Sequence, residues 1–467
     1  MFFRTFTDEK LAQYSYLVGC QKTGEAIVID PPRKVDHIIA VAEAEGLEIV
    51  AAADTHIHAD YVSGARQLAV EFGAKLYLSD EGDANWKYEF PDEDIDIELV
   101  KEGSKFSIGN VDFEVMHTPG HTPEHISFVL TDRGGGATEP LGIFTGDFVF
   151  VGDIGRPDLL EEAAGMVGTA KSGAHEMFKS IQRFKQLPDH MLVWPAHGAG
   201  SACGKSLGAV PISTVGYEKQ FNWAMQIDDE ETFVEELLKD QPEAPVYFAE
   251  MKRVNKVGPT VLKKENPIVI TDLNEFQNLR EKNDVLMIDA RMPSSAQKDL
   301  VKGSINIPLN NTFTNWAGWL VKYDERLVII AEENDFEEIT DALQSIGLDR
   351  IYGFVTPDTI ASVEKVTYET ISLDHFIKAM EEDDVYVIDV RNQSEWNEGH
   401  FEKANHHFIG FFRSVELPKN VNKVMVYCET GIRSAIAASI LKARGYEDVK
   451  HMTSGYEEAV LLNRISV

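Results

Sequence analysis

Short apolar runs alternate with turn-rich stretches through the first half of the chain. Residues 26–30 (Ala-Ile-Val-Ile-Asp) predict a strand that closes at Pro31. Residues 35–45 predict a helix that ends at Gly46, because their apolar positions recur at helical spacing. The other candidates are a helix over 228–240 and strands over 111–116, 141–145 and 191–194, each strand followed at once by Gly, Pro or His. The pattern predicts a layered α/β domain over residues 1–241.

A connector and an internal repeat follow this domain. Residues 242–262 are rich in proline and predict a connector. Beyond them, the segment 284–291 (Asp-Val-Leu-Met-Ile-Asp-Ala-Arg) matches 384–391 (Asp-Val-Tyr-Val-Ile-Asp-Val-Arg), 100 positions later. We therefore predict two copies of one α/β domain, over 263–365 and 366–467.

Composition and charge narrow the functional classes. The 467 residues are 43% hydrophobic, and no apolar run reaches the roughly 20 residues of a membrane span. A formal charge of −33 argues against nucleic acid or an anionic membrane as a partner, because both are bound through clustered Lys and Arg. Three cysteines do not make a disulfide framework, and the first residues have no signal-peptide pattern. We therefore expect a cytoplasmic protein.

Histidine and aspartate residues follow four apolar runs, the three predicted strands 111–116, 141–145 and 191–194 and a further short run over 50–53. Alternate residues at a strand end project the same way, so His56 and His58 can face one point. A cluster of imidazoles with a carboxylate suits a borderline metal such as zinc or iron. The candidate ligands are His56, His58 and Asp60 in the segment 55–61, His121 in 118–122, Asp147 in 145–147, and His197 in 195–198.

The order of these motifs resembles the metallo-β-lactamase superfamily, and within it the persulfide dioxygenases and glyoxalase II hydrolases. The segment 152–158 (Gly-Asp-Ile-Gly-Arg-Pro-Asp) is similar to the dioxygenase branch in particular. The resemblance implies an αββα sandwich. Tyr61 stands where the superfamily motif has a histidine that helps to hold a second metal, which argues against a dinuclear centre.

The dioxygenase resemblance implies one Fe(II) held by His56, His121 and Asp147. This 2-His-1-carboxylate set leaves positions open for substrate and O2. His58, Asp60 and His197 would then orient the ligands, and we expect Tyr61 to pack or to form a hydrogen bond. In the competing assignment His58 is itself a ligand and the metal is zinc.

The loop after His197 carries a second cysteine. Cys203 lies among Gly and Ser residues beside Lys205, a setting that favours a partly exposed thiolate with a catalytic or sulfur-relaying role. The alternative is an inert buried thiol. Arg156 and Lys205 are candidates for binding an anionic substrate carrier, whereas Cys20 is expected to be structural.

The third cysteine ends a predicted strand. Residues 424–427 are apolar, Cys428 follows them, and residues 435–442 predict a helix. Backbone N–H groups at this turn, the positive helix end and the charge of Arg433 all favour a thiolate nucleophile. The matches at 389–391, 399–400, 428–433 and 455–456 resemble rhodanese sulfurtransferases. The resemblance implies that Cys428 carries sulfur as a persulfide, cradled by loop backbone that includes Gly431.

The first copy of the repeat lacks the thiol. Its corresponding strand, 327–330, leads into Glu332, Glu333 and Asp335, whose charges would repel an anionic persulfide. We expect this copy to be a non-catalytic spacer or docking module.

Three functions are compatible with these motifs. The leading one is a dioxygenase that oxidises a low-molecular-weight thiol persulfide to sulfite with O2, coupled to thiosulfate formation at Cys428. The second is a dinuclear zinc thioester hydrolase with a sulfurtransferase tail, and the third is a sulfur-binding sensor or scaffold. We also expect a homo-oligomer, because members of the family commonly self-associate.

Overall fold

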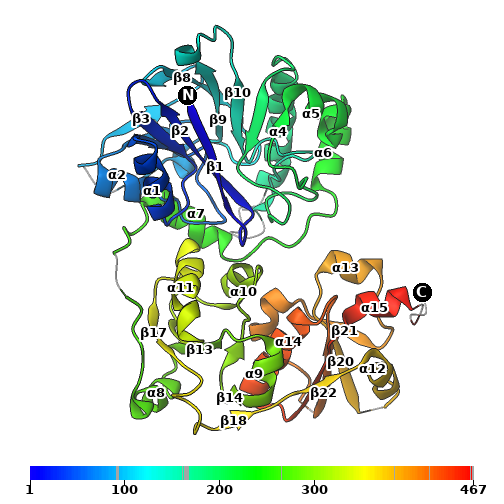
Figure 1. Cartoon of the computed structure of the whole chain (residues 1–467). Coiled ribbons are helices and arrows are strands. Elements are labelled where there is room, and N and C mark those ends of the chain that lie inside the picture. The colour runs from blue at the N-terminus through cyan, green and yellow to red at the C-terminus, as the bar shows by residue number, and fades with distance from the viewer. Residues whose placement is uncertain are drawn as a thin grey trace. The chain divides into compact units, whose positions relative to one another are not determined.

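A computed structural model describes residues 1–90, 94–159, 161, 168–263, 266–382, 384–419, 421–462 and 464. The chain divides into two compact units, one of residues 1–264 with 344–347 and one of residues 265–343 with 348–467 (Figure 1). Within the described residues, no helix combines the length and apolar content needed to cross a bilayer.

The first unit is built on two sheets packed face to face. Residues of both sheets, among them Tyr16, Phe113, Phe144 and Trp194, form the core between them. The first sheet runs β1 (Phe2–Asp8), β2 (Gln13–Cys20), β3 (Glu25–Ile29), β4 (Glu48–Ala53), β5 (Lys75–Ser79), β6 (Ile97–Val100). The second runs β12 (Ser213–Thr214), β11 (Leu192–Pro195), β10 (Gly142–Gly146), β9 (Ile126–Asp132), β8 (Val111–His117), β7 (Lys105–Ile108).

Helices cover the outer face of each sheet. Ile38 of α1 (Asp36–Ala44) and Leu68 of α2 (Ala65–Phe72) share a core with the first sheet. Met177 of α4 (Thr169–Phe184) and Phe233 of α6 (Glu230–Leu238) share a core with the second sheet, near α5 (Val215–Phe221). The order of layers is helix, sheet, sheet, helix, which confirms the predicted αββα sandwich.

The predicted connector contains a helix that belongs to the first unit. Helix α7 (Phe248–Val257) buries Phe248 and Met251 completely, so the prediction of a connector over 242–262 is wrong for this part. Its Asn255 donates from Nδ2 to the carbonyls of His58 (2.8 Å) and Tyr61 (2.7 Å). The flanking prolines concealed the helical spacing of its apolar residues. The finer boundaries at 241, 262 and 365 stay predictions.

The second unit holds the two copies of the repeat. In the first copy the sheet order is β15 (Ile305–Asn306), β13 (Val285–Asp289), β16 (Arg326–Ile330), β17 (Ile351–Val355), and β14 (Leu300–Val301) pairs with β18 (Lys365–Val366). In the second copy it is β19 (Glu369–Ile371), β23 (Asp448–Met452), β22 (Lys423–Tyr427), β20 (Val385–Asp389), β21 (Ala404–His406). The helices are α8 (Leu273–Arg280), α9 (Pro293–Asp299), α10 (Phe313–Leu320), α11 (Phe336–Ser345), α12 (Leu373–Ala379), α13 (Gln393–Glu398), α14 (Ile432–Ala443) and α15 (Gly455–Leu461).

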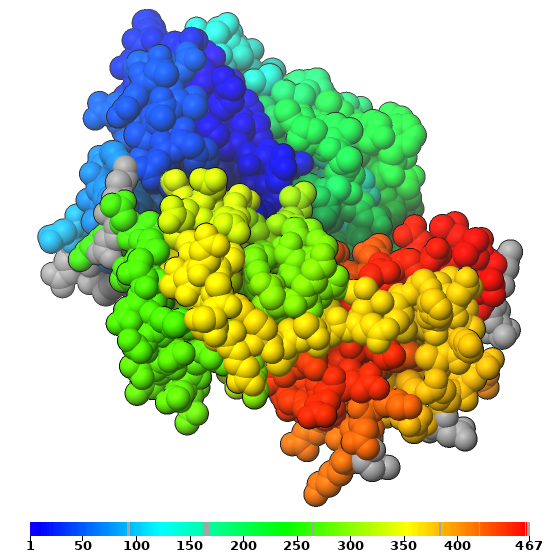
Figure 2. Space-filling view, turned by 60° about the horizontal axis from the view of Figure 1, so that its bottom comes forward, coloured from blue at the N-terminus to red at the C-terminus, as the bar shows by residue number. Residues whose placement is uncertain are grey.

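The two copies pack against each other through α14. This helix contacts its own strands β22 and β23 on one side and β15 of the first copy on the other, and residues 434–441 are all buried as a result. The backbone N–H of Asn306 donates to Ser439 Oγ at 2.8 Å. The ring of Trp319 lies 5.0 Å from that of Phe408. The copies therefore lie side by side (Figure 2).

Candidate metal centre and reactive cysteine

Four strand ends of the first unit carry the predicted ligands. His56 follows β4, His121 follows β8, Asp147 follows β10 and His197 follows β11. All four side chains are at least 93% buried. The strand ends bring together residues that are far apart in the sequence, as expected when several strands of a sandwich end at one edge.

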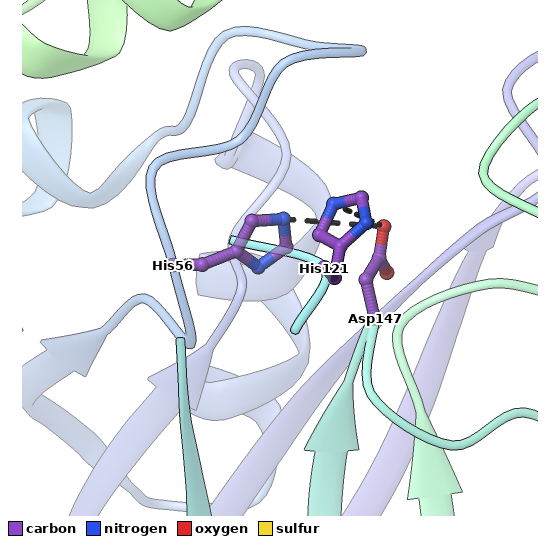
Figure 3. Close-up of side chains that lie close together, drawn as sticks. All are labelled: His56, His121 and Asp147. Carbon is purple, nitrogen blue, oxygen red and sulfur yellow. Dashed lines mark ion pairs between the residues drawn. The ribbon is translucent and has the colours of Figure 1, made fainter. Parts of the chain in front are cut away.

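His56, His121 and Asp147 converge on one point (Figure 3). The Nε2 atoms of His56 and His121 lie 3.9 and 3.5 Å from Asp147 Oδ2, and all three atoms fall within 4.8 Å of one another. His56 Nε2 and Asp147 Oδ2 are buried and have no hydrogen-bond partner among the described residues. Buried polar atoms without partners are costly, so these donors fit a bound metal ion.

Hydrogen bonds behind the two imidazoles fix their tautomers. His121 Nδ1 lies 2.9 Å from the carbonyl oxygen of Arg156, to which it can only donate. His56 Nδ1 lies 3.0 Å from Thr55 Oγ1, whose own hydrogen goes to Asp30 Oδ2 at 3.1 Å. Both Nε2 lone pairs therefore face the centre. Burial lowers the pKa of both imidazoles, which keeps them neutral and available as ligands.

His197 holds the carboxylate of Asp147 from behind. Its Nδ1 lies 2.7 Å from Asp147 Oδ1, and its Nε2 lies 2.7 Å from Asp60 Oδ2. Burial opposes protonation, but these two carboxylates hold the pKa of His197 well above its usual range. The imidazolium leaves Asp147 Oδ2 as the oxygen that faces the centre.

His58 and Tyr61 form a separate group beside the three converging residues. His58 Nε2 lies 3.2 Å from Asp30 Oδ1 and 3.0 Å from the hydroxyl of Tyr61. Burial disfavours the charged imidazole, but Asp30 and Asp54 raise the pKa of His58 to about 9. Tyr61 is fully buried against the His58 ring, so it packs and forms a hydrogen bond as predicted.

Three residues of the centre were missed from the sequence. Asp30 binds the backbone N–H of Thr55 at 2.7 Å, Glu124 accepts from Ile57 N at 2.9 Å, and His125 Nε2 accepts from Asp147 N at 3.1 Å. Burial raises the pKa of Glu124 to about 7. Asp30 follows strand β3 as the ligands follow theirs, a signal that was available.

The loop after β11 differs from its prediction. Cys203 is only 2% exposed, so the expected partly exposed thiolate is wrong. Burial, with Asp147 and Asp60 nearby, holds the pKa of Cys203 well above its usual range. The loop is buried because Asp153 binds its backbone. Asp153 Oδ2 accepts hydrogen bonds from the backbone N–H groups of Lys205 (2.9 Å) and Ser206 (2.8 Å), which holds the loop against the domain.

The two predicted carrier-binding cations, Arg156 and Lys205, differ in burial: Arg156 is buried, whereas Lys205 is half-buried. Arg156 is completely buried and forms a bidentate ion pair with Asp158, with Nε–Oδ1 at 2.9 Å. Lys205 Nζ donates to the carbonyl oxygen of Glu236 at 2.9 Å. The structure thus gives both side chains partners within the protein.

The third cysteine lies where β22 turns into α14. Cys428 is a free, fully buried thiol, and Gly431 donates its backbone N–H to Sγ at 3.1 Å. Arg433 forms two hydrogen bonds of 2.6 Å with Glu395, so its charge is shared with that carboxylate. The loop cradles the sulfur from the backbone side, as the sequence predicts.

Comparison with known proteins gives two family matches. A family model described as the metallo-beta-lactamase superfamily matches residues 9–197, and one described as a rhodanese-like domain matches residues 372–460. A crystal structure of a metallo-beta-lactamase from Staphylococcus aureus subsp. aureus COL is 44% identical with a TM-score of 0.69, over 76% of this chain and 99% of that one.

Two of the curated relatives illustrate the similarity, and each aligns with about half of the chain. PksB of Bacillus subtilis, a probable polyketide biosynthesis zinc-dependent hydrolase, is 30% identical over 47% of this chain and 85% of that protein. The mitochondrial persulfide dioxygenase ETHE1 of Mus musculus is 29% identical over 49% of this chain and 77% of that protein.

Proposed function

The chain belongs to the metallo-beta-lactamase superfamily as an enzyme with a metal-binding site and a C-terminal rhodanese-like domain, and from that membership we propose a persulfide dioxygenase coupled to a thiosulfate-forming sulfurtransferase. The observation that carries the proposal is the three-residue donor set of His56, His121 and Asp147, with Tyr61 bound to His58 in place of a further histidine.

The donor set fits mononuclear Fe(II). Two neutral imidazoles and one carboxylate form a three-donor set, a type of site that leaves coordination positions for exogenous ligands. Bound iron would supply the site at which O2 oxidises the terminal sulfur of a small-molecule thiol persulfide. With one water molecule as the further reactant, the products are sulfite and the free thiol.

The protein's own residues position and shield that centre. Thr55 and the carbonyl of Arg156 fix the imidazoles, while His197 fixes Asp147, so the donor atoms need little rearrangement when metal binds. The burial of His56, Asp147 and His197 keeps bulk water from the ligands.

Thiosulfate formation would use Cys428. The Cys428 thiolate first takes the outer sulfur of a small-molecule thiol persulfide, whose S–S bond breaks so that the thiol leaves as a thiolate. Sulfite then attacks the outer sulfur of the Cys428 persulfide with its lone pair, a new S–S bond forms, and the bond to Sγ breaks. The electron pair stays on Sγ as a thiolate, stabilised by the N–H of Gly431. Fusion of both activities in one chain raises the local concentration of sulfite at the acceptor site.

A zinc hydrolase is the second candidate. It is favoured by the similarity to a zinc-dependent hydrolase and by a second group of possible ligands, Asp60, His197 and Cys203, whose ligand atoms lie within 4.8 Å of one another. Two metal ions per chain would be its signature.

The test is metal content of anaerobically purified protein together with O2 uptake on addition of glutathione persulfide. We expect about one iron per chain and loss of O2 uptake in His121→Ala, because one of three ligands is removed. His190→Ala, which alters a surface imidazole bound to the Pro140 carbonyl, is the matched control. Two zinc ions per chain without O2 uptake would overturn the proposal.

A further inference from the structure

A buried row of hydrogen-bonding groups runs from the thiol of Cys428 to the imidazole of His451. Cys428 ends β22, Ser434 lies in the first turn of α14, and His451 lies in β23. Ser434 Oγ is 3.6 Å from Cys428 Sγ and 3.2 Å from His451 Nδ1. Cys428 and Ser434 are fully buried and His451 is 3% exposed, so this row is shielded from solvent.

The surroundings of His451 identify its tautomer. Its Nε2 is buried and has no hydrogen-bond partner among the described residues. A buried lone pair without a partner costs less than a buried N–H without one, so the hydrogen sits on Nδ1. Burial lowers the pKa of His451 to about 4, so the ring is neutral at neutral pH. Nδ1–H is therefore a donor that Ser434 Oγ shares with the backbone of Met452.

The hydroxyl hydrogen of Ser434 has two carbonyl acceptors within reach and gains a third acceptor when the sulfur of Cys428 is ionised. While Cys428 is a thiol, its S–H donates to Oγ, and the hydroxyl donates to the carbonyl oxygen of Gly431 at 3.0 Å, with that of Met452 farther away at 3.4 Å. In the persulfide Sγ carries no hydrogen, and when the S–S bond breaks Sγ becomes a thiolate, toward which the hydroxyl hydrogen can turn. Hydrogen bonds to ionised acceptors are roughly twice as strong as neutral ones, which favours that turn.

We propose that His451 is a positioning residue for sulfur transfer, which acts through Ser434 to hold a hydroxyl donor on the anionic sulfur of Cys428. The inference rests on the proposed sulfurtransferase function. Ser434 meets the charge that develops on Sγ when the S–S bond of the persulfide breaks, and His451 keeps the oxygen in place. No proton is exchanged with solvent, because the hydroxyl hydrogen only changes its acceptor.

The experiment uses the full-length protein and the transfer of sulfane sulfur from thiosulfate to cyanide, which needs no metal. Ser434→Ala should lower kcat about tenfold, since it removes a hydrogen bond to a charged group, and His451→Leu about threefold. The double variant should be no slower than Ser434→Ala alone, because His451 acts only through Ser434. KM for thiosulfate should stay the same.

Conservative variants separate positioning from a structural role. Ser434→Thr keeps the hydroxyl, and His451→Asn keeps an N–H near the place of Nδ1. Both should stay within about twofold of the wild-type kcat, whereas a purely structural defect would follow the melting temperature instead. Equal kcat in all variants, or multiplicative losses in the double variant, would overturn the inference.

The failure of the parent proposal would look different. If the wild-type protein shows no sulfur transfer that depends on Cys428, the sulfurtransferase function is wrong. The rate of alkylation of Cys428 by iodoacetamide at pH 7 still tests the hydrogen bond, and should fall about threefold in Ser434→Ala. An unchanged alkylation rate would overturn the inference on its own.

Discussion

The two copies of the repeat share a scaffold and differ in one loop. Arg291 pairs with Asp289 after β13, with Nη2–Oδ2 at 2.6 Å, and Arg391 pairs with Asp389 after β20, at 2.8 Å. These matched ion pairs stabilise the turn that follows the strand, β13 in the first copy and β20 in the second. The first copy therefore keeps the fold and the paired arginine although it has no thiol.

The loop after the next strand separates the copies. In the first copy β16 leads to the exposed acids Glu332 and Glu333. In the second, Gly431 has φ +95° and a Cβ there would lie 2.2 Å from the carbonyl oxygen of Thr453. A Cβ at Gly455 would lie 1.8 Å from that of Glu429. Close backbone packing, which only glycine permits, makes the sulfur cradle.

Removal of the thiol is the strongest test of this difference. Cys428→Ala should lower sulfur transfer by at least about a thousandfold, because the first copy has no nucleophile to replace it. O2 uptake should persist, with sulfite as the product in place of thiosulfate. The measurement is product analysis, with Cys20→Ser as the control. Thiosulfate released by Cys428→Ala would show that transfer does not need this loop.

The contact between the copies should matter for stability. Trp319→Ala removes a 7%-exposed ring that packs on Phe408 and Phe411, and should lower the free energy of unfolding of the second unit by about 3–5 kcal/mol. Phe411→Ala, at a residue 47% exposed, should cost less than about 1 kcal/mol. Denaturant titration measures both. Equal losses of stability in the two variants would mean that the contact between the copies does not stabilise the second unit.

Two glycines, one in each copy, have similar backbone conformations but different surroundings. Gly431 and Gly303 have similar φ angles, +95° and +91°, but a Cβ at Gly303 meets only Met287 Cε at 3.6 Å. Gly303→Ala should cost about 1–2 kcal/mol from backbone strain alone. Gly431→Ala adds a clash with backbone and should cost about 2 kcal/mol more, with loss of sulfur transfer. Similar costs at the two positions would contradict close packing of the cradle.

The smallest effect concerns pH and arises in the second copy alone. His451 has a pKa of about 4 in the folded chain, where burial keeps it neutral, against 6.5 in the unfolded chain. As the pH falls below 6.5, His451 becomes protonated in the unfolded chain but stays neutral in the folded chain. The folded state therefore loses about 2 kcal/mol of stability between pH 7 and 5. Denaturant unfolding at pH 7 and pH 5 should show a loss of stability that is about 2 kcal/mol larger in the wild-type protein than in His451→Leu. The same slope in both proteins would assign the effect to other groups.

Much of the fold and part of the centre could be predicted from the sequence. His56, His121 and Asp147 each follow an apolar run, and strand ends at one edge of a sandwich necessarily meet. His125 could not be assigned, because its role depends on a hydrogen bond to the backbone of Asp147. Local sequence does not encode such a partner.

The burial of Cys203 shows the same limit. Its polar, glycine-rich neighbours indicate an exposed loop, but the carboxylate of Asp153, 50 positions earlier, satisfies two backbone N–H groups of that loop. A buried loop is tolerated once its backbone donors are paired. The prediction therefore failed on a long-range contact and not on local propensity.

The side-chain amide of Asn255 decides how long a fragment of the N-terminal half must be to keep the metal-ligand loop folded. A fragment that stops at residue 241 retains every candidate metal ligand but loses the side chain that binds the carbonyls of His58 and Tyr61 and the N–H of Ser63. Those three backbone groups shape the loop between His56 and α2. The transferable module is therefore the sandwich together with α7, and gene fusions or fragments that keep this stretch preserve the ligand loop when the rest is exchanged.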